Sequence, residues 1–127
     1  MNERPPPIRV LAIDDDDAIR LSLRILLRRR GYEVLVASNG ADGFAQFAEQ
    51  RPAIVLCDMI MPGDEGVETI RKIRDLSPGV GIIAMSGSIK GGSASFLERA
   101  EEAGANLCLE KPFDTEELLE SLARLTA

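Results

Sequence analysis

The residues of this 127-residue chain best suited to chemistry are carboxylates: a run of four, Asp14–Asp17, and a further one, Asp58, after an apolar segment. Two like charges about 4 Å apart repel by about 4 kcal/mol at an effective dielectric constant of about 20. Carboxylates that are drawn together must therefore bind a cation or take up protons. Mg²⁺ suits them, because it prefers oxygen ligands and is usually shared between a few carboxylates and phosphate oxygens. The acidic residues predict a magnesium site that serves phosphoryl chemistry.

Two further polar residues, Ser86 and Lys111, also follow apolar segments. The lysine would place a second cation against phosphoryl oxygens, and the serine hydroxyl would donate a hydrogen bond to one of them. The nucleophile would be an aspartate carboxylate, which forms an aspartyl phosphate. One carboxylate has an ordinary structural explanation, since Asp16 or Asp17 is expected to cap the helix that follows.

The chain contains no histidine, which removes the most common general base, phosphoryl carrier and metal ligand. Any chemistry must run on carboxylates, hydroxyls, lysine or thiols. The two cysteines, Cys57 and Cys108, lie in apolar runs and lack the paired spacing of a zinc site or of a disulfide-rich secreted protein. We expect both to be reduced, buried thiols.

Apolar segments of strand length alternate with longer segments of helical periodicity. The expected strands are 8–13, 33–37, 53–57, 81–85 and 106–109. The first expected helix ends before Gly31, and the helices after it are 41–50, 66–76, 93–103 and 115–125. The segments 54–57 and 82–85 are apolar throughout, which is typical of a parallel sheet with helices on both faces. Ligands of such sheets bind at the carboxyl ends of the strands, which is where the polar residues above occur.

The length and composition are those of one globular domain with an aliphatic core: 45% of residues are hydrophobic and 28% are charged. The net charge of −6 opposes non-specific attraction to nucleic acids and anionic membranes. No segment approaches the roughly 18 uninterrupted apolar residues of a membrane helix, and no signal peptide is recognisable. We expect a cytoplasmic protein with a flexible proline-rich tail at 1–7 and one domain at 8–127.

Short motifs surround the polar residues: VLAIDD at 10–15, VLCDMIMPG at 55–63 with Gly66, IAMSG at 83–87 and LEKPF at 109–113. Through them the sequence resembles, from residue 8 to residue 125, the receiver domain of two-component response regulators, of which the chemotaxis protein CheY is the single-domain example. The resemblance implies a flavodoxin-like, CheY-like α/β fold. In this fold five βα units surround a five-stranded parallel sheet of order 2-1-3-4-5.

The resemblance also implies roles for individual residues. Asp58 would accept the phosphoryl group, Ser86 would close on it, and Lys111 would form a salt bridge to it. Asp14 and Asp15 would hold Mg²⁺ directly or through water, and Asp58 and the backbone carbonyl of Ile60 would be further ligands. In this family the peptide bond that corresponds to Lys111–Pro112 is usually cis.

Several positions depart from the usual receiver pattern. Cys108 stands where receivers usually have an aromatic residue, and we interpret it as a small packed hydrophobe. The glycines and serines of 87–93 predict a mobile loop. Ile60 and Ser88, which flank the phosphoryl site in the family, offer no carboxylate or amide to orient water. This predicts slow self-dephosphorylation.

The first helix has an apolar arc wider than packing on a sheet requires. One explanation is a docking surface of Ala18, Leu21 and Ile25, rimmed by Arg24 and Arg28, for a histidine kinase or histidine-phosphotransfer protein, as the family implies. The other explanation is that these residues pack on the fifth helix. The sequence leaves both open.

A second surface is acidic, because residues 98–127 carry eight acidic residues against three basic ones. In the family, the region from the fourth helix to the fifth binds output partners. We therefore expect an unknown protein target there, no direct binding of nucleic acid or membrane, and a monomer or weak dimer. Each acid taken singly is also consistent with a solvated helix face.

Together these inferences favour a stand-alone response regulator that accepts a phosphoryl group from a phosphohistidine onto Asp58 with Mg²⁺. It would be an enzyme only in the sense that it catalyses its own phosphorylation and dephosphorylation. The alternatives are a Mg²⁺-dependent phosphatase with an aspartate nucleophile and an Asp14–Asp16 pair, or the receiver part of a longer regulator. A flavodoxin-like module that binds a phosphate after the first strand is disfavoured, since four carboxylates there repel a phosphate.

Overall fold

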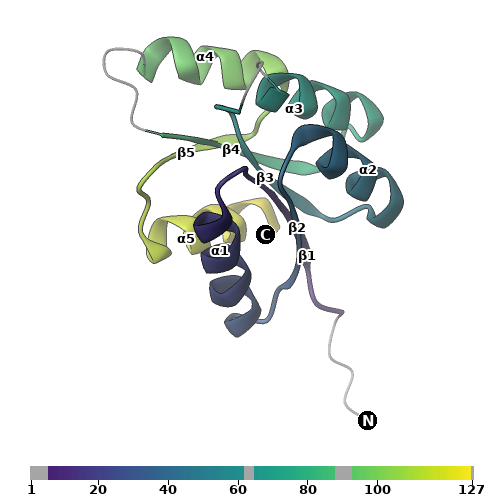
Figure 1. Ribbon diagram of the computed structural model, residues 1–127, viewed down its shortest axis with the longest axis vertical. Helices are drawn as coiled ribbons and strands as arrows, with labels where there is room; N and C mark the ends of the chain where they lie inside the picture. Colours follow the sequence, from purple (N-terminus) through teal and green to yellow (C-terminus); the bar gives the residue numbers. More distant parts are fainter. Residues whose placement is uncertain (1–5, 62–64, 88–92, 127) are drawn as a thin grey trace.

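The computed structural model describes residues 6–61, 65–87 and 93–126, with the backbone alone for 93–97, and its strands and helices alternate along the chain (Figure 1). The strands are β1 (Arg9–Ile13), β2 (Glu33–Ala37), β3 (Ile54–Asp58), β4 (Gly81–Ser86) and β5 (Leu107–Glu110). The helices are α1 (Asp17–Arg29), α2 (Gly40–Gln50), α3 (Glu65–Leu76), α4 (Ser93–Ala103) and α5 (Thr115–Thr126).

All the predicted strands and helices are present, and each predicted first or last residue lies within one position of the observed one. The shift matters at two strands. Asp58 and Ser86, which were expected to follow β3 and β4, are instead their last residues, paired with Met85 and Glu110 of the neighbouring strands. The two polar side chains are therefore fixed by the sheet rather than by a loop.

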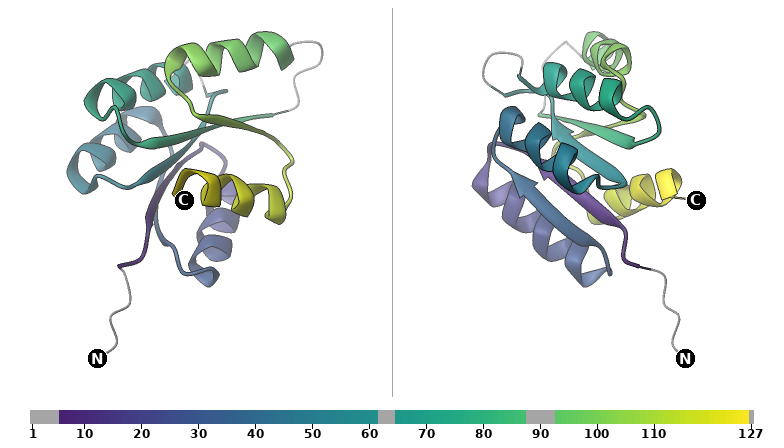
Figure 2. Two further views of the ribbon diagram at one scale, coloured as in Figure 1. Left: turned by 180° about the vertical axis from the view of Figure 1, so that it is seen from behind. Right: turned by 90° about the vertical axis from the view of Figure 1, so that its right-hand side faces the viewer.

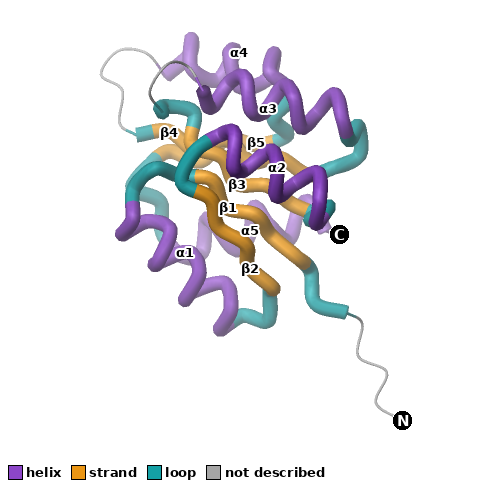
Figure 3. The backbone as a smooth tube through the Cα atoms, turned by 45° about the vertical axis from the view of Figure 1, so that its right-hand side comes forward, coloured by secondary structure: helices purple, strands orange, loops and turns teal. Residues whose placement is uncertain are grey.

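The sheet is parallel, and its strands lie in the order β2-β1-β3-β4-β5, as the receiver resemblance implied. The strand order reverses between β1 and β3, which pair directly with Ile13 opposite Cys57. Figure 3 shows the strands as a central layer between helices. Because Asp14 follows Ile13 and Asp58 follows Cys57, this register brings the two acids to the same point of the sheet edge.

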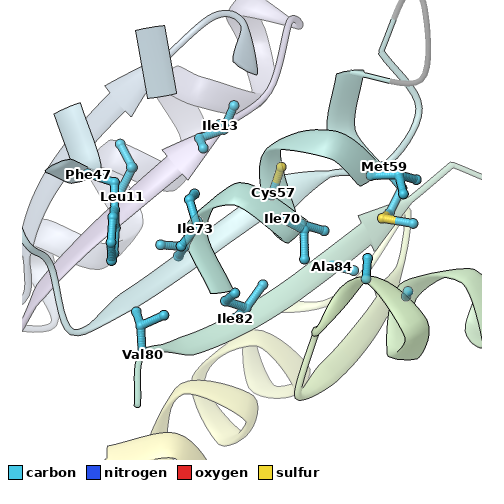
Figure 4. Packing of buried hydrophobic residues seen from close by; sticks show 14 of the residues in the cluster. Leu11, Ile13, Phe47, Cys57, Met59, Ile70, Ile73, Val80, Ile82 and Ala84 are labelled. Atoms are coloured by element: carbon cyan, nitrogen blue, oxygen red, sulfur yellow. The ribbon is translucent and has the colours of Figure 1, made fainter. Parts of the chain in front are cut away.

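Helices cover both faces of the sheet (Figure 2). One buried cluster joins β1, β3 and β4 to α2, α3 and α4 and includes Leu11, Phe47, Ile70 and Ile82 (Figure 4). The second cluster joins the other face of the sheet to α1 and α5 through residues such as Leu23, Leu27, Leu118 and Leu122. Burial on both faces explains why β3 and β4 read as apolar throughout.

The first helix begins at the predicted capping position. Asp16 is the N-cap of α1, and its Oδ1 accepts hydrogen bonds from the backbone N–H groups of Ala18 at 2.8 Å and Ile19 at 3.2 Å. Arg28 and Arg29 lie in the last turn, where cations interact favourably with the helix dipole. Asp16 is thus used structurally.

Some sequence predictions fall on other parts of the chain. The predicted tail 1–7 lies outside the described residues except for residues 6 and 7. The loop predicted to be mobile, 87–93, lies outside them except for residues 87 and 93, and so Ser88 is also outside. Within the described part of the chain, every helix is too short or too polar to span a bilayer.

Candidate functional site

Three carboxylates meet at the carboxyl edge of the sheet. One oxygen atom each of Asp14, Asp15 and Asp58 lies within 4.8 Å of the other two. Asp14 is 0% exposed and Asp58 4% exposed, whereas Asp15 faces solvent. The predicted cluster is therefore present, with two of its members removed from water and a third at the entrance.

Asp14 is held by contacts to all of its polar atoms. Its backbone N–H donates to the Ala37 carbonyl at 3.1 Å, and its own carbonyl accepts from Arg20 at 2.8 Å. Its Oδ1 accepts from the Asp16 N–H at 2.9 Å, and its Oδ2 accepts from the Lys111 ammonium at 2.6 Å. A buried carboxylate this fully bonded has little freedom to move.

Asp58 is more available to a ligand. Its Oδ1 accepts one hydrogen bond from the Ile60 N–H at 3.0 Å, and its Oδ2 lies 3.4 Å from the Lys111 Nζ. Just behind it, α3 approaches so closely that a Cβ on Gly66 would lie 2.7 Å from the Met59 Cα. The sequence motif contained this glycine without giving its role, which is to let α3 pack against the backbone beside Asp58.

Lys111 joins the two buried acids. Its Nζ contacts Asp14 and Asp58, and its backbone N–H donates to the Ser86 carbonyl at 2.5 Å. The Lys111–Pro112 peptide bond is cis, which confirms the prediction. One ammonium group thus partly offsets the repulsion between two carboxylates.

The electrostatics of Asp58 differ from those of an exposed acid. Burial raises the pKa of Asp58 above its ordinary value, and the charge of Asp14 raises it further. The Ile60 amide and the Lys111 ammonium lower the pKa of Asp58 and partly offset these effects. A further cation at this carboxylate would stabilise its charged form.

The neighbouring Cys57 has no comparable reactivity. Burial, and then the nearby carboxylates, raise the pKa of this thiol well above its ordinary value. Reactive cysteines are usually exposed thiols with lowered pKa values. Cys57 is therefore a core residue, as predicted, while the expectation for Cys108 was too strong, because it is only partly buried.

The donor atoms fit a hard divalent cation. Three carboxylates within 4.8 Å of one another, with the ammonium of Lys111 beside two of them, leave negative charge that Mg²⁺ can neutralise with oxygen ligands. Of the other predicted site residues, Ser86 ends β4 one position beyond Met85, the partner of Asp58. The Ile60 N–H donates to the Asp58 carboxylate, and Ile60 is 51% exposed.

The response regulator receiver domain model matches residues 10–123 of this chain. The chain belongs to the response regulator receiver domain family. Among solved structures, a CheY-like receiver domain protein from Methanospirillum hungatei is 30% identical, with a TM-score of 0.84 and 94% of both chains covered. The chemotaxis protein CheY4 of Vibrio cholerae is 29% identical, with a TM-score of 0.84, over 94% of this chain and 98% of that one.

Two curated relatives differ in length. Response regulator MprA of Mycobacterium sp. (strain KMS) is 36% identical over 119 residues, which are 94% of this chain and 50% of that protein. Sporulation initiation phosphotransferase F of Bacillus subtilis is 28% identical over 124 residues, which are 98% of this chain and 94% of that protein. This receiver domain therefore spans about half the length of the MprA relatives.

The structure excludes one of the two explanations for the wide apolar arc of α1. Leu21 is 57% exposed and Ile25 45% exposed, so packing of these residues on α5 is wrong. The helix instead meets the core through Leu23 and Leu27. Ala18 is also exposed and lines a groove beside the β5–α5 segment.

That groove has a volume of about 530 Å³ and a mostly apolar lining. It is lined by Leu23 and Leu26 of α1 on one side and by Phe113 on the other, and it includes Lys111. The groove therefore reaches the residue that contacts both buried acids. It has the size of a ligand or side-chain binding site.

Proposed function

We propose that this receiver domain accepts a phosphoryl group onto Asp58 from the phosphohistidine of a histidine kinase or histidine-phosphotransfer protein. The observation that carries the proposal is the contact of one ammonium, Lys111, with Asp14 at 2.6 Å and Asp58 at 3.4 Å beside a third carboxylate. Such a site combines a nucleophile, a lysine and ligands for a divalent cation, which is what phosphoryl transfer requires.

The residues divide the reaction among them. An Asp58 oxygen attacks the phosphorus, the bond from phosphorus to the donor's imidazole nitrogen breaks, and the imidazole leaves with the electron pair. Lys111 pairs with a phosphoryl oxygen, and Ser86 donates its hydroxyl hydrogen bond to another. When bound, Mg²⁺ would supply positive charge against the phosphoryl oxygens. Its ligands would be carboxylate oxygens of Asp14, Asp15 and Asp58 and the carbonyl of Ile60.

The phosphatase alternative finds less support. It needs Asp16 as a second member of an acidic pair with Asp14. The Oδ1 of Asp16 instead caps α1 by accepting two backbone hydrogen bonds, and Asp16 is exposed. The described residues offer no other acid within the 4.8 Å cluster than Asp15 and Asp58.

Chemical labelling tests the proposal. Incubation with acetyl phosphate and Mg²⁺ should give one phosphoryl group per chain that is stable to acid and labile to base. Asp58→Asn should abolish it, and Asp16→Asn should retain it. Turnover of a phosphomonoester without a stable adduct would favour the phosphatase and refute the receiver mechanism.

For the donor we propose docking on the outer face of α1. Ala18, Leu21 and Ile25 form the exposed apolar part of this face, and the exposed Arg24 and Arg28 border it. The adjoining groove leads to Lys111. An apolar strip with a charged border is the usual form of a protein interface.

A matched pair of variants tests this docking face. Leu21→Glu should slow phosphotransfer from a histidine-phosphotransfer protein and leave labelling by acetyl phosphate unchanged. Leu76→Glu, which changes an exposed leucine on α3, serves as the control. Equal slowing by both variants would refute a specific role for α1.

The remaining proposals concern output and context. The acids of α4, β5 and α5 are exposed, and we propose that they bind a protein target rather than nucleic acid or membrane. We propose that residues 8–127 form the receiver unit, that it is a monomer or weak dimer, and that it works in the cytoplasm. Its two free cysteines fit a reducing compartment. It acts either alone or as the receiver part of a longer regulator.

A further inference from the structure

We propose that Glu65 is a positioning residue for the metal site, because it fastens the segment that follows Asp58 to the N-terminus of α2. This inference rests on the proposed function, since it concerns the same cation. Glu65 is the first residue of α3 and lies five positions after Ile60. Neither its position in the sequence nor the family motif suggested this role.

Glu65 binds backbone N–H groups at the start of α2. The first turn of a helix has N–H groups without intrahelical partners. Here the N-cap Asn39 accepts from Asp42 at 2.8 Å, and Glu65 Oε1 accepts from both Gly40 and Ala41, the latter at 3.3 Å. Two of the first three N–H groups of α2 are thus bound by a carboxylate from another helix. A negative charge at this helix end is also favourable.

The contact is close and held from both sides. A Cβ added to Gly40 would lie 2.7 Å from the Glu65 Cγ, which is too close for two carbon atoms. Glycine at position 40 therefore leaves the space that the Glu65 side chain occupies. On the other side, the buried Thr69 donates from Oγ1 to the Glu65 carbonyl at 2.6 Å. Glu65 is therefore fixed both through its side chain and through its backbone.

The start of α2 is in turn fixed to the segment that carries Asp14. The Asp14 N–H donates to the Ala37 carbonyl at 3.1 Å, three residues before α2 begins. In addition, α2 packs so closely on β1 that a Cβ on Gly43 would lie 2.5 Å from the Ile13 Cδ1. The β2–α2 segment thus forms a rigid neighbour of Asp14.

The residue after Glu65 is fixed to Asp58. Gly66 lies against the backbone of Asp58 and Met59, as described above. Pairing of β1 with β3 already sets Asp58 beside Asp14, so Glu65 acts on the segment after Asp58, which carries Ile60, by binding the start of α2. A cation that also takes the Ile60 carbonyl depends on where this segment lies, and residues that orient metal ligands commonly affect metal affinity by about 10- to 100-fold.

Metal binding without a phosphoryl donor tests the proposal. Mn²⁺, used as a probe in place of Mg²⁺, is titrated into the protein by calorimetry. Glu65→Ala should raise the Mn²⁺ dissociation constant by about tenfold. Glu65→Gln keeps an acceptor oxygen and should restore affinity to within about threefold of wild type. Glu68→Ala removes an equal charge from an exposed position one turn along and should bind as wild type does.

Hydrogen exchange supplies the second readout. The Gly40 and Ala41 amides should exchange faster in Glu65→Ala than in wild type and recover protection in Glu65→Gln. Faster exchange with unchanged Mn²⁺ affinity would show that Glu65 only caps α2 and would overturn the proposal. Equal weakening by Glu68→Ala, or no recovery in Glu65→Gln, would also overturn it.

The same measurements separate this proposal from the proposed function. A wild-type chain that binds no Mn²⁺ and takes no phosphoryl group would refute both, and this is seen before any variant is compared. A wild type that binds Mn²⁺ and is labelled at Asp58, together with a Glu65→Ala variant of unchanged affinity, would refute only the role of Glu65. If Glu65→Ala does not fold, Glu65→Gln against Glu68→Ala decides the question.

Discussion

Arg74, at the end of the sheet opposite the acidic site, offers a sharp test of what stabilises this fold. Its Nε and Nη2 donate to the Gly104 carbonyl at 2.9 and 2.8 Å, and its Nη1 donates to the carbonyls of Pro78 at 2.9 Å and Val80 at 2.6 Å. Its Nη2 also donates to the Asn106 Oδ1 at 2.7 Å. One guanidinium thus joins the end of α3, the start of β4 and the turn between α4 and β5.

The magnitude follows from these bonds. A hydrogen bond to a charged group contributes about 1.5–3 kcal/mol. Arg74 is only partly buried, so water can replace some of its bonds to the carbonyls when the guanidinium is removed. We therefore expect Arg74→Met to lower the free energy of unfolding by about 3 kcal/mol, which is a large part of the about 5–15 kcal/mol of a typical domain. At this chain length, the midpoint of thermal unfolding should fall by about 10 °C.

Urea unfolding followed by far-ultraviolet circular dichroism measures this loss. Arg71→Met, which changes an exposed arginine on the same helix, is the control and should cost less than about 0.5 kcal/mol. Labelling of Asp58 by acetyl phosphate should be unchanged in Arg74→Met below its unfolding temperature. A loss below about 1 kcal/mol, or an equal loss in the control, would refute the reasoning.

Three further predictions concern the site. The pKa of Asp58 is higher in the folded state than in the unfolded chain. Between these two pKa values the folded state keeps a proton that the unfolded chain has released, so the free energy of unfolding falls as pH rises through this range. In EDTA, Asp58→Asn should therefore be more stable than wild type at pH 7, with the difference vanishing below about pH 3.9, as pH-dependent unfolding would show. Replacing the exposed Ile60 by glutamine provides an amide that can orient water, so the lifetime of the aspartyl phosphate, measured by loss of label, should shorten by about tenfold. An unchanged lifetime would contradict the prediction that Ile60 makes dephosphorylation slow. Burial raises the pKa of the Cys57 thiol, so iodoacetamide at pH 8 should leave it unmodified until the chain unfolds, and rapid alkylation seen by mass spectrometry would contradict its core position.

Much of the fold could be predicted because its signals are local. Apolar runs such as 54–57 and 82–85 identify buried strands, and residue type alone narrows the cap of the first helix to Asp16 or Asp17. The site residues could be named because they follow apolar strands and match family motifs. What brings Asp14 to Asp58 is the pairing of β1 with β3, which the family resemblance supplied and the residues alone did not.

Other features depend on how far side chains reach across the fold. Arg74 binds the Gly104 carbonyl thirty positions away, and Glu65 binds α2 from a separate helix. Nothing in the spacing of these residues distinguishes them from surface charges. Cys108 was expected to be buried, but it lies on β5, which pairs with β4 alone at the edge of the sheet. An edge strand has fewer neighbours to cover its side chains.

The ion pair between Lys111 and Asp14 has a consequence for the order in which the site is made. Its partners are 97 positions apart, one after the first strand and one after the last. During synthesis, domains fold as units while the chain emerges from its N-terminus at about 5–20 residues per second. Both buried acids have therefore left the ribosome several seconds before their ammonium is available. The paired carboxylates of Asp14 and Asp58 therefore gain their ammonium only when the last strand has been made, so the site is completed at the end of synthesis.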